Sequence, residues 1–105
     1  NDKVAAVEIE HSYKRKQQHE ASILKFKSAM LDTPKLYDQV FLVVASNKIH
    51  ADTQRFYDQL LEEMPNRINK KTKQPMLTIA EAEYLKENII FRTKFIKDIN
   101  RIFYK

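Results

Sequence analysis

Two groups of side chains in this sequence have types and spacings that occur in metal-binding or catalytic centres. In the first group, Glu8 and His11 are three residues apart, so a helix would place them on one face. Carboxylate-bridged di-iron bundles use two such Glu-x-x-His pairs and two further glutamates, and this chain contains a single pair. His19 and His50 are too scattered to complete a ligand set, and His19 lies in a polar stretch where we expect it at the surface. The sequence therefore predicts no metal site.

The second group, Ser46, His50 and Asp52, has the composition of a hydrolase triad. Such a triad needs its acid to hold the far nitrogen of the imidazole. On a helix Asp52 lies about 200° around from His50 and so points away from it. The chain also contains no glycine, which the phosphate-binding Walker and dinucleotide loops require. With no nucleophile turn and no oxyanion site indicated, we expect a protein that is not an enzyme and uses no cofactor.

Basic side chains give the most specific binding signal. The formal net charge is +5, and residues 65–77 carry four basic side chains and no acidic one. Such a cluster creates a positive field that can attract anionic lipid, at roughly 1 kcal/mol per base, or the phosphates of nucleic acid. Ile68, Met76 and Leu77 would add apolar insertion, and the alternative is a flexible, solvated loop. The predicted anionic-surface site consists of Arg67, Lys70, Lys71 and Lys73.

A second set of basic residues is spread over both ends of the chain. A continuous stripe of this kind could grip a membrane or nucleic acid, but acidic residues such as Glu83 and Glu87 interrupt it. No base-stacking aromatic pattern accompanies it. The members of this possible second basic surface are Lys14, Arg15, Lys16, Lys94, Lys97 and Arg101.

An acidic cluster lies at the end of the second predicted helix. Asp58, Glu62 and Glu63 are close in sequence, at a helix end where negative charge is mildly unfavourable. We interpret them as a solvated helix end whose carboxylates pair with Lys or Arg. A contact for a basic partner is the alternative.

The elements that position these residues read as three long helices. A chain without glycine is poorly suited to the many tight turns of a β-rich fold. Pro34 suits a first helical position, and Thr78 with Glu81 forms a capping box. We predict one all-α domain over residues 1–105, an elongated antiparallel three-helix bundle that dimerisation would complete. The predicted helices are residues 2–31, 34–64 and 78–104, and the basic loop is 65–77.

Two stretches bear on this architecture. Residues 14–20 are polar on every side for about two helical turns, so we expect that part of the first helix to project from the core. Residues 40–45 are apolar on all sides and could instead form a buried strand. Because no second strand candidate is available to pair with it, we favour a helix there.

The segment DTQRFYDQLLEEMP, residues 52–65, resembles the end of the second helix in BAR domains of the amphiphysin and endophilin kind. In that family the helix tends to close in Leu-x-Glu-Glu-Leu-Pro. Tyr13-Lys-Arg-Lys and residues 21–30 are similar to the basic, periodic part of that same helix, and residues 84–103 are similar to the third helix of the family. The resemblance implies a curved antiparallel dimer that binds anionic membrane through basic residues on its concave face and tips. The 13-residue loop after Met64 departs from the family, so we carry over only lipid contact by Lys70, Lys71 and Lys73.

These patterns predict a non-enzymatic helical interaction or scaffolding module, in its leading form a dimeric, membrane-binding, BAR-like domain. The alternatives are a nucleic-acid-binding helical domain and a small adaptor or inhibitor that docks on a protein partner. We expect a homodimer or a protein partner, with anionic membrane and nucleic acid as open possibilities and no small-molecule substrate. The lack of cysteine and of any long apolar run predicts an intracellular, cytoplasmic protein, at most peripheral to a membrane. The missing initiator Met suggests an excised domain or a processed chain.

Overall fold

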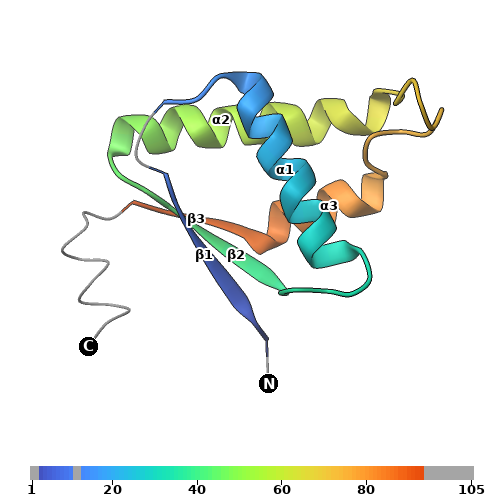
Figure 1. Ribbon diagram of the computed structural model, residues 1–105. Helices are drawn as coiled ribbons and strands as arrows, with labels where there is room; N and C mark the ends of the chain where they lie inside the picture. Colours follow the sequence, from blue (N-terminus) through green and yellow to red (C-terminus); the bar gives the residue numbers. More distant parts are fainter. Residues whose placement is uncertain (1–2, 11–12, 94–105) are drawn as a thin grey trace.

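The computed structural model describes residues 3–10 and 13–93, and they form a mixed α/β fold (Figure 1). Three parallel strands make one sheet in the order β1-β2-β3. The prediction of an all-α three-helix bundle was therefore wrong. The elements in chain order are β1 (Ala5–Glu10), α1 (Lys16–Leu31), β2 (Gln39–Val44), α2 (Asn47–Glu63), the short 3-10 helix η1 (Met64–Asn66), α3 (Ile79–Asn88) and β3 (Ile89–Thr93).

All three α-helices lie on one side of the sheet, as Figure 1 shows. The connection from β1 to β2 contains α1, and the connection from β2 to β3 contains α2 and α3. Both connections advance in the same direction across the sheet, and crossovers of one hand then place their helices on the same face. The hydrophobic core forms between this helical layer and the sheet, with Phe26, Leu60 and Leu85 among its buried members.

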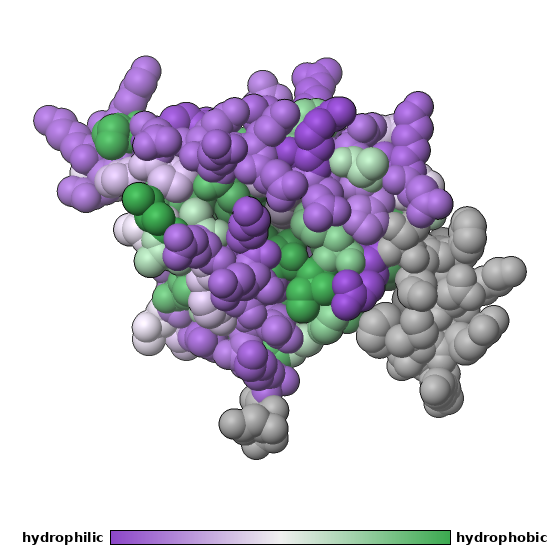
Figure 2. Space-filling model, turned by 180° about the vertical axis from the view of Figure 1, so that it is seen from behind, coloured by the Kyte–Doolittle hydropathy of each residue, from purple (hydrophilic) through white to green (hydrophobic). Residues whose placement is uncertain are grey.

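The strand register separates the sheet into a core face and an open face. Ala6, Val40 and Ile89 are paired across the three strands; Val40 and Ile89 belong to the core, and Ala6 packs against it. Side chains alternate along a strand, so the intervening residues point to the opposite face, away from the helices. This face is apolar: Val7 and Ile9 are exposed on it, Phe41 and Ile90 are half-buried, and Val43 in the central strand is buried. On the side seen in Figure 2 the surface is largely hydrophilic, and apolar side chains reach it mainly in the centre.

The second predicted helix, residues 34–64, is in fact a loop, a strand and a helix. Residues 39–44, QVFLVV, form the central strand β2. The prediction of a helix for the apolar stretch at 40–45 was therefore wrong. The strand ends before Ser46, whose hydroxyl accepts a hydrogen bond from the Ile49 N–H and caps α2. Pro34 lies in the preceding loop rather than at a helix start. Consecutive β-branched residues favour the extended chain, and burial against both neighbouring strands and the helices favours it further.

The first and third predicted helices are each shorter than expected, because a strand takes part of each range. The segment 5–10 is β1, so the first helix begins at Lys16 instead of residue 2. The third helix ends at Asn88 and β3 follows immediately. The predicted continuation from residue 94 to 104 lies outside the described residues. The capping box of α3 is confirmed: the Thr78 hydroxyl accepts from the Glu81 N–H at 3.0 Å, and the Glu81 carboxylate accepts from the Thr78 N–H at 2.8 Å.

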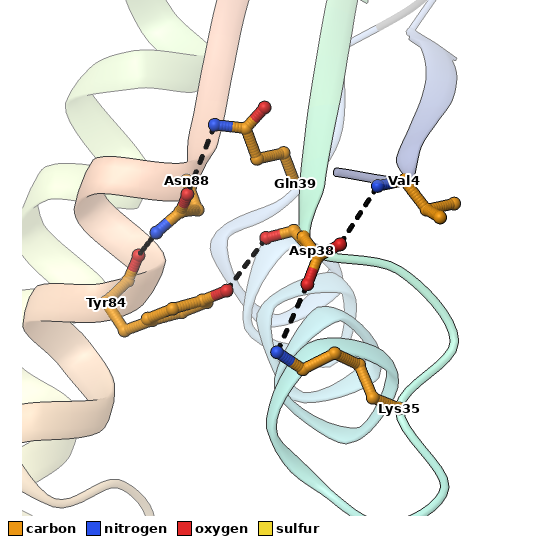
Figure 3. A network of polar contacts seen from close by, with 6 residues as sticks. All are labelled: Val4, Lys35, Asp38, Gln39, Tyr84 and Asn88. Atoms are coloured by element: carbon orange, nitrogen blue, oxygen red, sulfur yellow. Dashed lines mark hydrogen bonds and ion pairs between the residues drawn. The ribbon is translucent and has the colours of Figure 1, made fainter. Parts of the chain in front are cut away.

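Asp38 fastens the amino-terminal ends of β1 and β2 to α3 (Figure 3). Its carboxylate accepts hydrogen bonds from the Val4 N–H at 2.9 Å and from the Lys35 ammonium at 3.2 Å. Its main-chain carbonyl accepts one from the Tyr84 hydroxyl at 3.0 Å. The bond from the Val4 N–H, with help from Lys35, holds the pKa of Asp38 below its ordinary value. Asp38 therefore stays ionised and keeps the two strand ends together at neutral pH.

A second polar contact joins β2 to the end of α3. The Gln39 side-chain amide donates to the Asn88 carbonyl oxygen at 3.3 Å, and the Asn88 amide donates to the Tyr84 main-chain carbonyl at 2.9 Å (Figure 3). The Asn88 side chain thus connects Gln39 of β2 to the main chain of α3. This fixes the point at which the helix gives way to β3.

Candidate anionic-ligand interface

The basic loop is a hydrogen-bonded turn, which we call the basic turn and define as residues 67–76. The Asn69 N–H donates to the Gln74 carbonyl at 2.8 Å, and the Lys73 N–H donates to the Asn69 carbonyl at 2.7 Å. Near its base the Met76 N–H donates to the Arg67 carbonyl at 2.9 Å. The turn thus has the pairing of a short hairpin, and its basic side chains stand on an ordered backbone.

The side chain of Asn69 organises the tip of the basic turn. Its oxygen accepts hydrogen bonds from the Lys71 N–H at 2.9 Å and the Thr72 N–H at 3.4 Å. The Thr72 hydroxyl in turn accepts one from the Gln74 N–H at 3.3 Å. Asparagine commonly makes this local bond, because its short amide mimics a main-chain carbonyl. These bonds indicate an ordered turn at a position where the sequence also allowed a flexible loop.

Lys73 closes the turn with a left-handed backbone, at φ 57°. A residue with a Cβ pays about 1 kcal/mol for this conformation, and glycine is the usual occupant. This chain contains no glycine, and it places a lysine at the one described position with positive φ. Strained positions tend to be kept where the side chain has a role. Lys73 is therefore of particular interest among the lysines of the turn.

Replacing Lys73 with Gly is expected to raise the free energy of unfolding by about 1 kcal/mol, because the steric cost at Cβ disappears. The same substitution removes one positive charge, so it should weaken binding to any anionic partner. Urea unfolding measures the first effect, and titration with anionic vesicles measures the second. Lys73→Gln is the matched control, since it loses the charge but keeps the strain. If Lys73→Gly were less stable than Lys73→Gln, the left-handed backbone would not cost what we infer.

The structure divides the four predicted anion-binding residues into two kinds. Lys70, Lys71 and Lys73 are exposed, and among the described residues none of them forms an ion pair. Arg67 instead pairs with Glu20 of α1 and lies 3.8 Å from a carboxylate oxygen of Glu63. Its charge is largely neutralised, so it fastens the base of the turn to the helices. The free positive charge belongs to the three lysines.

The second basic surface is not assembled in the part of the chain that the structure describes. Lys14 pairs with Glu10 at 3.0 Å, and Lys16 pairs with Glu63 at 2.9 Å. Arg15 precedes the first turn of α1. Lys94, Lys97 and Arg101 lie outside the described residues. The pairing of Glu63 with Lys16 and Arg67 fits our interpretation of the acidic cluster as a helix end with ion pairs, and Lys16 helps to hold the pKa of Glu63 below its ordinary value.

The residues with triad composition do not converge. The Ser46 hydroxyl is used as the helix cap, and the His50 ring lies 3.1 Å from the Gln54 side-chain oxygen. The Asp52 carboxylate pairs with Arg55 at 3.4 Å. Each group is thus occupied by a different neighbour on α2.

The Glu-x-x-His pair also does not form a site in the described structure. Glu8 pairs with Lys25 at 2.9 Å, and His11 lies outside the described residues. Within residues 3–10 and 13–93, no group of three or more His, Asp or Glu side chains is arranged to hold a metal ion.

A shallow cleft of about 600 Å³ runs beside β1 and contains Leu36 and Tyr37. Its charged side chains are already engaged: Glu8 with Lys25, and Asp32 with Lys27. A small-molecule site normally offers a few converging polar groups that await a ligand. This cleft therefore gives no indication of a substrate site.

His19 was expected at the surface, and it is buried, with 2% of its area exposed. Its ring packs against the rings of Phe56, at 5.6 Å between centroids, and Tyr57, at 5.5 Å. Burial lowers the pKa of His19 below its ordinary value of 6.5, against the opposing effect of Glu10. The folded protein thus binds this proton less readily than the unfolded chain, so the contribution of His19 to stability is present above pH 6.5 and declines as the pH falls below it.

Comparison of the chain with protein-family models, with characterised proteins and with solved structures finds no match. The function must therefore be inferred from the residues themselves. None of the described helices is both long and apolar enough to cross a bilayer.

Proposed function

We propose that this protein is a non-enzymatic binding module that contacts an anionic lipid surface through the basic turn. The observation that carries the proposal is the ordered display of Lys70, Lys71 and Lys73. Their three ammonium groups are exposed, unpaired within the described structure and held on a hydrogen-bonded backbone. A preorganised display loses less conformational entropy on binding than a flexible loop of the same charge.

The charge of the turn is large enough for reversible membrane contact. Each lysine near an anionic leaflet contributes about 1 kcal/mol, so three contribute about 3 kcal/mol. Ile68 lies beside the lysines with 57% of its area exposed, and it can add apolar insertion. This contact would be peripheral, because it uses a turn at the surface of the fold.

Nucleic acid is the competing polyanion. A single-stranded partner normally finds aromatic side chains on which its bases stack, and residues 65–77 contain no aromatic residue. An exposed isoleucine beside the lysines has a use at a lipid surface and little use against phosphates. These features support lipid as the partner.

The fold limits what the BAR resemblance contributes. The curved all-helical dimer that the resemblance implies is not the observed architecture, which contains a parallel sheet. No comparison tests the resemblance itself. The lipid contact by the three lysines depends only on the geometry of the turn, so we propose it on that basis.

The proposal predicts that Lys70→Gln/Lys71→Gln weakens binding to vesicles rich in phosphatidylserine about 30-fold. Two lost charges at about 1 kcal/mol each account for this change. Vesicle co-sedimentation over a lipid titration measures it. Lys48→Gln/Lys86→Gln is the matched control, because both residues are exposed, lie outside the turn and remove the same charge. The control should bind almost as tightly as the unchanged protein.

Three outcomes would contradict the proposal. One is the absence of binding to anionic vesicles at low salt. Another is equal weakening by the two double variants, which would show that net charge alone attracts the protein. The third is tighter binding to duplex or single-stranded nucleic acid than to vesicles at the same salt concentration, which would favour the alternative.

A further inference from the structure

Strand β1 has one edge without a neighbouring strand in the described structure, because it lies at the end of the sheet order. The main-chain bonds show which of its residues face that edge. The Val4 carbonyl accepts from the Gln39 N–H, and the Glu10 carbonyl accepts from the Ala45 N–H. In a parallel ladder, alternate residues bond to the same neighbour. The even-numbered residues of β1 therefore bond to β2, and the main-chain groups of Ala5, Val7 and Ile9 point outward.

The outer edge of β1 also carries apolar side chains. Val7 and Ile9 are 43% and 45% exposed, and both lie on the open face of the sheet. Sheet edges in soluble proteins are normally protected by proline, by a bulge or by inward-pointing charges. The segment 5–10 has no proline, and its two inward-pointing charged side chains, Glu8 and Glu10, are neutralised by ion pairs with Lys25 and Lys14 of the same chain. This edge can therefore accept a further strand.

We propose that β1 pairs with β1 of a second copy of this chain, in an antiparallel register with Val7 opposite Val7. The two outward-facing Val7 residues then exchange an N–H and a carbonyl with each other. On each side of this central pair, Ala5 of one copy lies opposite Ile9 of the other, and the main-chain groups of both residues also face outward. The strand is thus complementary to itself at every outward position. The result is one continuous six-stranded sheet, built from two copies of the three strands described.

The charge pattern of β1 favours this register over its neighbours. A register centred on Glu8 would place two Glu8 carboxylates directly opposite each other, and like charges in that position are destabilising. A register centred on Val7 places Glu8 opposite Ala6, which is small and uncharged. Glu8 keeps its ion pair with Lys25 of its own chain. A register shifted by one residue is also excluded. It would place the outward-facing residues of one copy opposite residues of the other copy whose main-chain groups already bond to β2.

Pairing of this kind also extends the apolar open face. Directly opposite residues in an antiparallel pair point to the same side of the sheet. Val7 and Ile9 of both copies therefore join on one face, while all helices lie on the other. Dimerisation therefore has two effects: it partly covers these side chains, and it pairs the outward-facing main-chain groups of β1. It is independent of lipid binding, because the basic turn is not part of β1.

A disulfide test distinguishes this register from other arrangements. The chain contains no cysteine, so one introduced thiol reports on one position. In the proposed dimer the two residues at position 7 have Cα atoms about 5.5 Å apart, which suits a disulfide. The two residues at position 9 are offset by four residues, about 13 Å along the strands. Mild oxidation should therefore link Val7→Cys into a dimer, while Ile9→Cys stays unlinked.

Sedimentation equilibrium of the unchanged chain provides a measurement that needs no folded variant. We expect a monomer–dimer equilibrium that Val7→Pro shifts to monomer, because proline removes the outward N–H and leaves the β1–β2 bonds intact. Val7→Thr is the control that keeps the N–H. A strict monomer at high concentration would overturn the proposal. So would equal cross-linking at positions 7 and 9, or capture of Val7→Cys by a different protein in place of itself.

Discussion

Truncating Leu42 to alanine is expected to lower the free energy of unfolding by about 3 kcal/mol. Leu42 lies in the middle of β2, is 3% exposed and belongs to the core between the sheet and the helices. Removing its side chain leaves a cavity that the surrounding strands and helices cannot close. Urea unfolding followed by far-ultraviolet circular dichroism gives the value.

The neighbouring residue provides the control for the Leu42 substitution. Phe41 is larger but points to the open face, where it is half-buried and the Arg92 guanidinium lies 6.0 Å from its ring centre. Phe41→Ala should therefore cost clearly less than Leu42→Ala, despite the greater number of atoms removed. A larger loss at Phe41 would mean that the face without helices is the better packed of the two.

Replacing Tyr57 with alanine is expected to lower the free energy of unfolding by about 4 kcal/mol. Tyr57 is 2% exposed, and its ring contacts both Phe91 of β3, at 5.3 Å between centroids, and His19 of α1, at 5.5 Å. It therefore joins α2 to two other elements. Thermal or urea unfolding at pH 7.5, where His19 is neutral, measures the loss without interference from protonation.

The Tyr57 prediction has a second readout at His19. A cavity in place of the Tyr57 ring would admit water beside the imidazole, so the pKa of His19 should rise back towards 6.5. An NMR pH titration of the histidine ring detects this change. Phe41→Ala is the control, since Phe41 is a half-buried aromatic residue on the open face of the sheet, away from the helical layer that contains His19. An unchanged His19 titration in Tyr57→Ala would contradict the packing we describe.

The strands were missed because their sequence signals are short and ambiguous. Residues 5–10, AAVEIE, alternate between apolar and charged side chains from Val7 onward, which is the pattern of a half-buried strand. Alanine and glutamate are also good helix formers, so the same segment equally predicts part of a long helix. If residues 5–10 are helical, the apolar run at 40–45 has no partner strand in the sequence. Parallel pairing between distant segments leaves no local turn that would have revealed it.

The candidate site was predicted in composition and missed in detail. The sequence shows the run of bases, but the order within the turn depends on the hydrogen bonds of Asn69, and the neutralisation of Arg67 depends on Glu20 of a distant helix. The burial of His19 did have a signal. It is spaced four, seven and eleven residues from Ile23, Phe26 and Met30, which are large buried residues of α1. Polar neighbours on both sides obscured that stripe.

The strand order described above has a consequence for the timing of folding. Val4 and Asp38 are 34 residues apart, and Gln39 and Asn88 are 49 residues apart, yet each pair joins adjoining elements. Contacts of such long range slow the search for the native topology. The β1–α1–β2 unit is complete by residue 44. During synthesis it can therefore form first, and β2 waits with one side unpaired until the ribosome has released β3 some 45 residues later, as the element bounds require.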